Sequence, residues 1–196
     1  MKRAILLSVI PLFTACAQGP QAAPAAPAYV SEAPLPEGWP QPGAYNQVSE
    51  KSYPAYRAAF TTGKGETGSF WTLFMHIKRN EIPMTAPVEM QVTPSATGLD
   101  RAGMAFLYQS EKVGQPGAAS SSVEVRDVPA SKVLSYTWQG PDSKANQATA
   151  RAALEAALAQ RKLTATGFRL LGYNGPGTPR AQATWELLAV LPAPPK

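Results

Sequence analysis

The stretch YPAYR at residues 53–57 returns as VPASK at residues 128–132, 75 positions further along the chain. A strand is predicted after each copy, over residues 55–61 and over residues 131–138. The two stretches share only the central Pro-Ala pair, so the match is weak in sequence. Its value lies in the elements that follow, because their order is the same after both copies.

One helix and two strands are predicted after the first copy. Ser69 is a residue type that caps helix N-termini. It precedes apolar residues at the i, i+3, i+4, i+7 spacing of a single helix face, which are Phe70, Leu73, Phe74 and Ile77. Pro83 and Pro87 break the helical pattern, and strands follow over residues 88–93 and through the alternating apolar positions 104–108.

The second copy is followed by the same series. A helix is predicted from a cap at Asn146 to about Lys162, with an apolar stripe made of Ala150, Leu154, Ala157 and Leu158. Strands are predicted over residues 168–173 and 184–191. The chain therefore reads strand-helix-strand-strand twice, which indicates an α+β fold. We expect the two units to pack their sheets together under both helices and to leave a groove between the halves.

The N-terminus has the pattern of an export signal. Lys2 and Arg3 precede a mostly apolar core over residues 4–12, which is too short to span a bilayer. Without these two cations the formal charge falls from +5 to +3, and the remaining basic residues are scattered. Nucleic acid is therefore excluded as a partner, because it requires clustered basic residues.

The FTAC run at residues 13–16 resembles the lipobox of bacterial lipoproteins. We predict a signal peptide over residues 1–15 and lipidation of Cys16, which would anchor the chain in a membrane. An ordinary secretory signal is the alternative. Ala17, where Asp would redirect sorting, indicates by resemblance to Gram-negative lipoproteins an outer-membrane protein that faces the periplasm.

Residues 16–44 are rich in Ala and Pro and predict an extended tether, followed by one domain over residues 45–192. Trp39 within this tether is expected to pack back on the domain edge. Cys16 is the only cysteine, so a disulfide, a thiol nucleophile and a cysteine zinc site are excluded for the mature domain. With a single histidine, no G-x-S-x-G elbow and no phosphate loop, an enzyme is the less favoured class.

Two features near the first helix could carry chemistry. His76 lies about 110° from the centre of the apolar stripe, at its boundary. Trp71 and Met75 lie on the opposite flank, where they could pack under a loop or line a ligand site. The IPMTAPV run that follows, residues 82–88, is interpreted mainly as a corner that fixes how the chain enters the next strand.

These pieces together resemble the SOUL heme-binding proteins. The resemblance rests on the helix pattern, on IPMTAPV, on GYNGP at residues 172–176 and on Trp185, and it runs from about Tyr45 to Leu191. It implies a duplicated strand-helix-strand-strand distorted barrel, similar to gyrase-inhibitor-like domains. It also implies reversible, non-catalytic binding of heme or a related tetrapyrrole by a monomer.

Site residues carried over by this resemblance are a helix wall and a loop. The wall is Phe70, Leu73 and Phe74, and the loop before the last strand, residues 174–180, supplies Arg180 for a propionate. His76, where the family usually has tyrosine, becomes an optional axial ligand to heme iron.

Two other classes of function remain open. An envelope interaction or structural lipoprotein would keep the fold without a ligand, and a groove filled by Trp71, Tyr173 or Trp185 would favour it. A small hydrolase would be favoured by a buried glutamate aimed at the groove, such as Glu81, Glu89 or Glu186.

Overall fold

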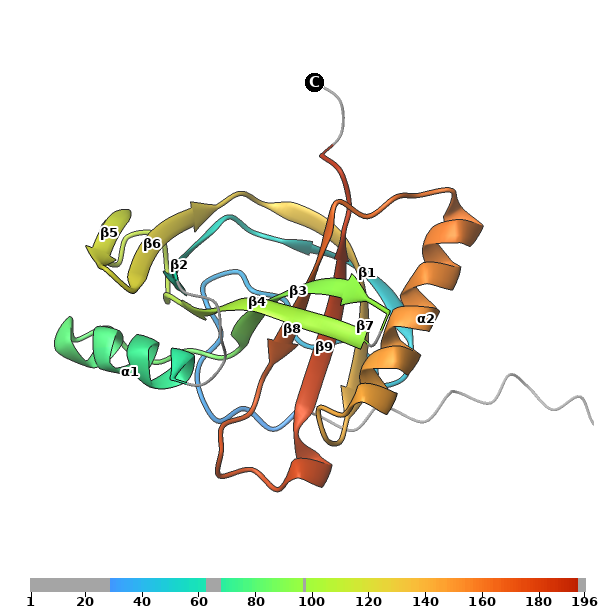
Figure 1. Ribbon diagram of the computed structural model, residues 1–196, viewed down its shortest axis with the longest axis horizontal. Helices are drawn as coiled ribbons and strands as arrows, with labels where there is room; N and C mark the ends of the chain where they lie inside the picture. The colour runs from blue at the N-terminus through green and yellow to red at the C-terminus, as the bar shows by residue number, and fades with distance from the viewer. Residues whose placement is uncertain (1–28, 63–67, 97, 194–196) are drawn as a thin grey trace, which may run out of the picture.

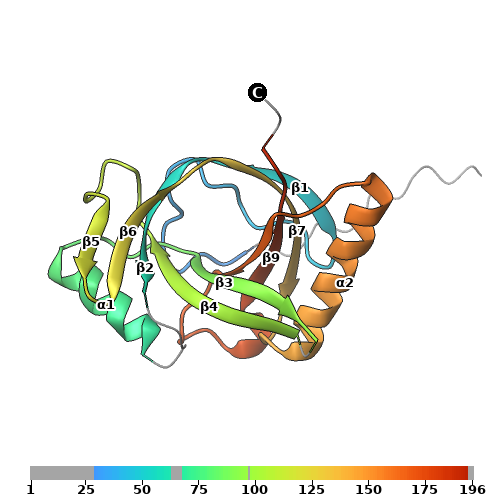
Figure 2. The same ribbon diagram turned by 45° about the horizontal axis from the view of Figure 1, so that its top comes forward.

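The computed structural model describes residues 29–62, 68–96 and 98–193, which form one curled antiparallel sheet flanked by two α-helices. The elements in chain order are β1 (Val48–Tyr53), β2 (Tyr56–Thr61), α1 (Ser69–Arg79), β3 (Val88–Ser95), β4 (Gly98–Leu107), β5 (Gly117–Ser120), β6 (Val123–Val128), β7 (Ser131–Gln139), α2 (Lys144–Arg161), β8 (Gly167–Gly172), the 3₁₀ turn η1 (Arg180–Gln182) and β9 (Thr184–Val190). Both helices lie outside the curl (Figures 1 and 2).

The order of the strands is nearly palindromic. It runs β1-β7-β9-β8-β3-β4-β2-β6-β5, so a pseudo-twofold axis passes between β8 and β3. The first strand of each half pairs with the other half: β1 with β7 and β6 with β2. Tyr53 therefore faces Ser131, while Tyr56 faces Val128. The two copies of the repeated stretch meet at these pairs.

The predicted α+β class, the duplication and the two helices on the sheet are confirmed. The repeat is longer than strand-helix-strand-strand, because a strand also precedes the Pro-Ala pair in each half, β1 in the first and β6 in the second. β6 begins at Val123, where the sequence predicts a strand after the Gly- and Ser-rich stretch 114–122. β1 was missed because its sequence, VSEKSY, has no apolar alternation. It lies at the sheet edge, and only Tyr53 in it is buried.

The helix caps differ from the prediction. Gly68 occupies the N-cap of α1 in a left-handed conformation with φ 96°, and Ser69 is the first helical residue. Glycine tolerates this φ because it lacks a Cβ. In α2 the cap is Ser143, whose side chain accepts the N–H of Asn146. Asn146, which the sequence predicted as the cap, is instead the third residue of α2.

The core has an inner layer and two outer layers. Leu73 and Ile77 of α1 and Leu154 and Leu158 of α2 pack on the outside of the sheet. The inner layer is covered by the segment before β1, which enters the curl in Figure 2. Trp39 from this segment is 7% exposed, which confirms that it packs back on the domain.

The rings that hold Trp39 explain why this segment is ordered. Its indole meets Tyr53 and Tyr56 edge to face, with ring centroids 4.6 and 5.1 Å apart. Residues 29–44 of the predicted tether thus contact the domain, whereas the predicted signal peptide and Cys16 lie outside the described residues. Within the described ranges, no helix is long and apolar enough to cross a membrane.

Candidate functional site

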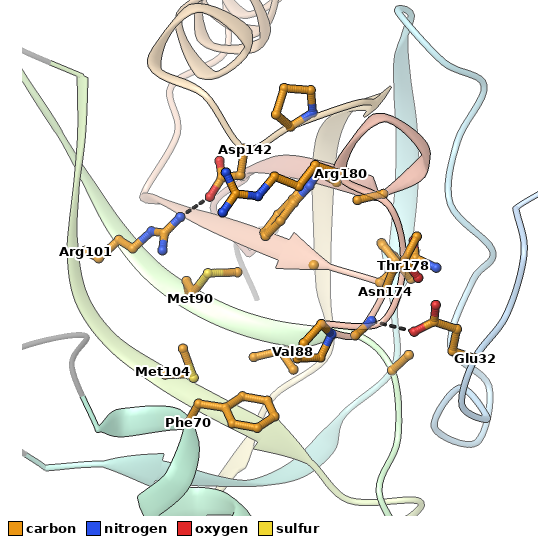
Figure 3. A pocket seen from close by; sticks show the side chains of 18 of the residues that line it. Glu32, Phe70, Val88, Met90, Arg101, Met104, Asp142, Asn174, Thr178 and Arg180 are labelled. Atoms are coloured by element: carbon orange, nitrogen blue, oxygen red, sulfur yellow. Dashed lines mark hydrogen bonds and ion pairs between the residues drawn. The ribbon is translucent and has the colours of Figure 1, made fainter.

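A cleft of about 1270 Å³ lies between the two helices, on the outer side of the sheet. Its walls come from α1, from the corner before β3, from the β3–β4 hairpin, from the start of α2 and from the loop before β9. Its apolar side chains include Phe70, Phe74, Met84, Val88, Met90, Leu99, Met104, Tyr173 and Trp185. Its polar side chains include Glu32, Arg101, Asp142, Lys144, Gln147, Asn174, Thr178 and Arg180 (Figure 3).

Trp185 and Gly172 form part of the floor. A Cβ on Gly172 would lie 2.8 Å from the Trp185 ring, so only glycine lets the indole rest directly on β8. The Trp185 indole N–H is buried and has no hydrogen-bond partner among the described residues. A buried donor without a partner is unfavourable.

The IPMTAPV corner forms another wall and is fixed from both sides. The Thr85 hydroxyl donates to the carbonyl of Leu107 at 2.6 Å, and the N–H of Ala86 donates to the carbonyl of Pro34 at 3.0 Å. Met84 and Val88 pack against the core under α1 and also line the cleft. The corner therefore orients the chain, as predicted, and contributes apolar surface to the site.

The opposite end of the cleft is charged. Arg101 from β4 forms an ion pair with Asp142, and the Gln147 amide donates to Asp142 at 2.5 Å. Arg180 and Lys144 are exposed beside this pair. Because the N-terminus of α2 also carries partial positive charge, this end favours anions. Sequence reasoning found Arg180 but missed Arg101 and Lys144, which come close only through the fold.

The loop over residues 174–180 is held against the segment before β1. The N–H of Gly175 donates to the Glu32 carboxylate at 2.6 Å, and the Asn174 amide donates to the carbonyl of Val30 at 3.1 Å. The Asn174 side-chain oxygen also accepts the N–H of Thr184 at 2.8 Å. These bonds fix the loop that carries Arg180.

The predicted site residues separate into two groups. Phe70, Phe74 and Arg180 line the cleft, whereas Leu73 is fully buried beneath α1 and His76 lies outside the lining. The apolar stripe of α1 faces both the core and the cleft, and the spacing of its residues alone does not show which of them face the cleft. The binding roles themselves stay predictions.

His76 is engaged elsewhere. Its Nε2 lies 2.8 Å from the hydroxyl of Tyr108, and its Nδ1 lies 3.3 Å from the Asn80 amide nitrogen. Burial lowers the pKa of His76 and raises the pKa of Tyr108 to about 12, so the neutral pair is favoured. Among the described residues, no group of three or more His, Cys, Asp or Glu side chains is placed to hold a metal ion.

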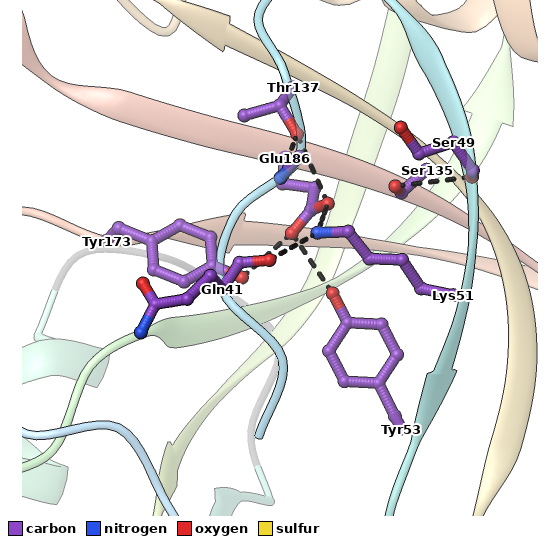
Figure 4. Close-up of polar contacts among 9 residues, drawn as sticks. Gln41, Ser49, Lys51, Tyr53, Ser135, Thr137, Tyr173 and Glu186 are labelled. Atoms are coloured by element: carbon purple, nitrogen blue, oxygen red, sulfur yellow. Dashed lines mark hydrogen bonds and ion pairs between the residues drawn. The ribbon is translucent and has the colours of Figure 1, made fainter. Parts of the chain in front are cut away.

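Two buried carboxylates lie away from the cleft, on the inner side of the sheet. Glu186 accepts hydrogen bonds from Tyr53 at 3.0 Å and Tyr173 at 2.8 Å, and its other oxygen lies 2.5 Å from Lys51 Nζ (Figure 4). Thr137 donates to the same carboxylate at 3.2 Å. This network is saturated by protein groups and leaves no room for a substrate.

Glu89 is the second of these carboxylates. The Tyr56 hydroxyl donates to it at 2.5 Å, and Arg169 Nε lies 3.9 Å away. Burial raises the pKa of Glu89, although Arg169 opposes this change. Glu81, Glu89 and Glu186 are all absent from the cleft lining, so the feature expected for a hydrolase is not found there.

A family model decides the relationship of this chain to known proteins. The model of the SOUL heme-binding protein matches residues 42–188. The chain belongs to the SOUL family. The predicted resemblance to the SOUL family is therefore confirmed. Membership implies heme or tetrapyrrole binding at the level of the family. The cleft of this SOUL protein lies almost wholly within the matched residues.

Solved structures share the fold at low sequence identity. The C-terminal domain of EcmrR is 15% identical, with a TM-score of 0.55 over 74% of this chain and 97% of that chain. A protein described as a hydrolase from Listeria innocua is also 15% identical, with a TM-score of 0.56 over 74% of this chain and 92% of its own. Such likeness shows the fold alone. No curated protein matches the SOUL chain.

Proposed function

We propose that this SOUL protein binds heme or a related tetrapyrrole in the cleft, reversibly and without catalysing a reaction. In the same proposal, lipidated Cys16 anchors it in the outer membrane, facing the periplasm. The observation that carries the binding proposal is an open cleft of about 1270 Å³ with an apolar part and a cationic end. Small-molecule sites are commonly about 300–1,000 Å³, so a large planar ligand has space.

The apolar walls fit the faces of a macrocycle. Phe70 and Phe74 stack in parallel, with centroids 6.2 Å apart, and form a broad aromatic surface on α1. Met90, Met104 and Trp185 supply apolar surface from the sheet. Burial of apolar area against these walls would drive binding.

The cationic end fits the carboxylates of a tetrapyrrole. Arg180 and Lys144 are exposed cations at the rim, while Arg101 shares its charge with Asp142. These residues would orient the ligand, with its propionates toward the start of α2 and its ring toward α1.

Iron ligation by His76 is not required by this arrangement. Heme, when bound, supplies an iron centre that can accept an axial ligand. His76 does not line the cleft, whereas the thioethers of Met84, Met90 and Met104 do. Apolar and ionic contacts therefore account for most of the proposed affinity. A macrocycle without iron should also bind.

A parallel titration tests the proposal. The mature chain is titrated with heme and with iron-free protoporphyrin, and the Soret band is followed at low and high ionic strength. We expect saturable spectral changes with both at micromolar concentrations, weakened by salt because Arg180 and Lys144 are exposed. No saturable change with either compound would refute tetrapyrrole binding. A change with heme alone would assign the affinity to iron ligation.

The alternative of an interaction lipoprotein without a ligand is less well supported. It was expected to show a groove filled by Trp71, Tyr173 or Trp185. Tyr173 and Trp185 do line the cleft, but the cleft is open with both side chains in place. Trp71 is exposed and does not belong to the lining.

A further inference from the structure

The outward face of α1 carries an exposed apolar ridge. Trp71 is 65% exposed and Met75 is 41% exposed, one helical turn apart. The described residues hold two other exposed large apolar side chains, Val30 and Leu163, and neither belongs to α1. Lys78 continues the same face, and Arg79 lies beside it, both exposed. We call Trp71, Met75 and Lys78 the outer ridge.

The outer ridge is rigid and adjoins the cleft. Leu73 and Ile77 hold α1 in the core from the opposite side. The Trp71 ring packs edge to face against Phe70 and Phe74, each with a centroid distance of 5.7 Å. Since those two phenylalanines line the cleft, the ridge and the cleft wall form one aromatic surface. The exposure of Trp71 is thus a property of a fixed helix.

The chemistry of the outer ridge matches a lipid surface. Tryptophan prefers the interface between water and hydrocarbon, and cations beside it attract anionic headgroups. A stable protein interface buries roughly 800 Å² on each partner, far more than two side chains offer. Residues 17–28 join Cys16 to Tyr29, and an extended chain of that length spans at most about 47 Å. Lipidation of Cys16, as proposed above, would therefore keep the domain within that distance of a bilayer.

We propose that the outer ridge docks on a bilayer that contains anionic lipid, with Trp71 and Met75 in the interface and Lys78 at the headgroups. Docking places Phe70 and Phe74 next to lipid, so an apolar ligand can pass between the bilayer and the cleft with little exposure to water. This inference rests on the membrane attachment in the proposed function and is independent of tetrapyrrole binding.

Quenching by brominated lipid tests the docking. The mature chain is reconstituted with vesicles of phosphatidylcholine and phosphatidylglycerol whose acyl chains carry bromine, and tryptophan emission is recorded. We expect strong quenching, most of which is lost in Trp71→Phe, because Trp39 and Trp138 are 7% and 3% exposed and Trp185, the fourth tryptophan, is only partly exposed in the floor of the cleft. Lys78→Gln should weaken the contact by about fivefold, as should omission of phosphatidylglycerol. Leu163→Ser, an exposed apolar position outside α1, is the matched control and should leave quenching unchanged.

Two outcomes would overturn the docking. Quenching that is the same in Trp71→Phe and in the unsubstituted chain would place other tryptophans at the lipid. A change in Trp71 emission that depends on protein concentration and not on lipid would assign the ridge to a second copy of the chain. Flotation of the vesicles measures anchoring separately, so a chain that floats without Trp71 quenching keeps the anchor and loses the docking.

Discussion

The two sides of the curled sheet divide the chemistry of this protein. The inner side holds two buried carboxylates, Glu89 with one tyrosine and Arg169, and Glu186 with two tyrosines and Lys51. It is sealed by the segment that carries Trp39. The outer side holds the open cleft, with aromatic and thioether walls. The buried glutamates, which could take part in acid–base chemistry, therefore lie on the side without a cavity. The cleft lies on the other side, where its walls suit ligand binding. This separation favours a binding protein over an enzyme.

The largest effect of a substitution, a loss of stability, is expected on the inner side of the sheet. Lys51→Met leaves the carboxylate of Glu186 without its cation, and we expect the free energy of unfolding to fall by about 3–5 kcal/mol. Denaturant unfolding measures it, with Lys132→Met on the exposed surface of β7 as the control. Heme affinity of the folded fraction should not change. A loss of stability no larger than in the control would contradict the role given to Lys51.

The free energy of unfolding should also depend on pH through Glu89 on the inner side. Burial raises the folded-state pKa of Glu89 above its ordinary value of 4.5, so the folded protein holds this proton more tightly than the unfolded chain. The contribution of this proton to stability is thus present below pH 4.5 and is lost as pH rises through the folded pKa. The difference in unfolding free energy between the unsubstituted chain and Glu89→Gln should change with pH in that window. A constant difference from pH 4 to about pH 8 would contradict it.

Substitutions on the outer side should affect ligand binding more than stability. Phe74→Ala removes half-buried aromatic surface from the cleft wall, and we expect tetrapyrrole affinity to fall about tenfold, equivalent to about 1.4 kcal/mol. Met75→Ala, the next residue of α1 but outside the lining, is the matched control. Equal losses in the two variants would place the ligand elsewhere.

The smallest effect on binding is expected at the only histidine. His76→Ala removes the partner of the buried Tyr108 hydroxyl, so stability should fall by about 1–3 kcal/mol. The heme spectrum and affinity should stay the same, because the side chain does not line the cleft. Loss of a Soret feature in this variant, at equal folded fraction, would restore His76 as an axial ligand.

Sequence patterns revealed the helices and the duplication because their signals are local. The stripe of α1 correctly grouped Phe70 with Phe74, yet it could not separate residues that face the cleft from Leu73, which faces the core. The polar strand β1 escaped detection because it has no apolar alternation, and its partner β7 lies about 80 residues away. The charged end of the cleft escaped for a similar reason, since Arg101 and Lys144 belong to different halves. The packing of Trp39 was predicted, but the Ala/Pro composition of residues 29–44 concealed the other contacts that this segment makes with the domain.

The exchange of first strands between the halves has a consequence for how the chain must fold. β1 finds its hydrogen-bonding partner only after β7 has been made, and β6 completes the edge of a strand that precedes it by more than a helix and a hairpin. Neither half is a closed unit, because each alone would leave one strand without a neighbour and one edge bare. Contacts of such long sequence separation slow folding, since their loop entropy is lost before they form. The duplicated halves should therefore fold as one cooperative unit, so a destabilising substitution in either half should destabilise both.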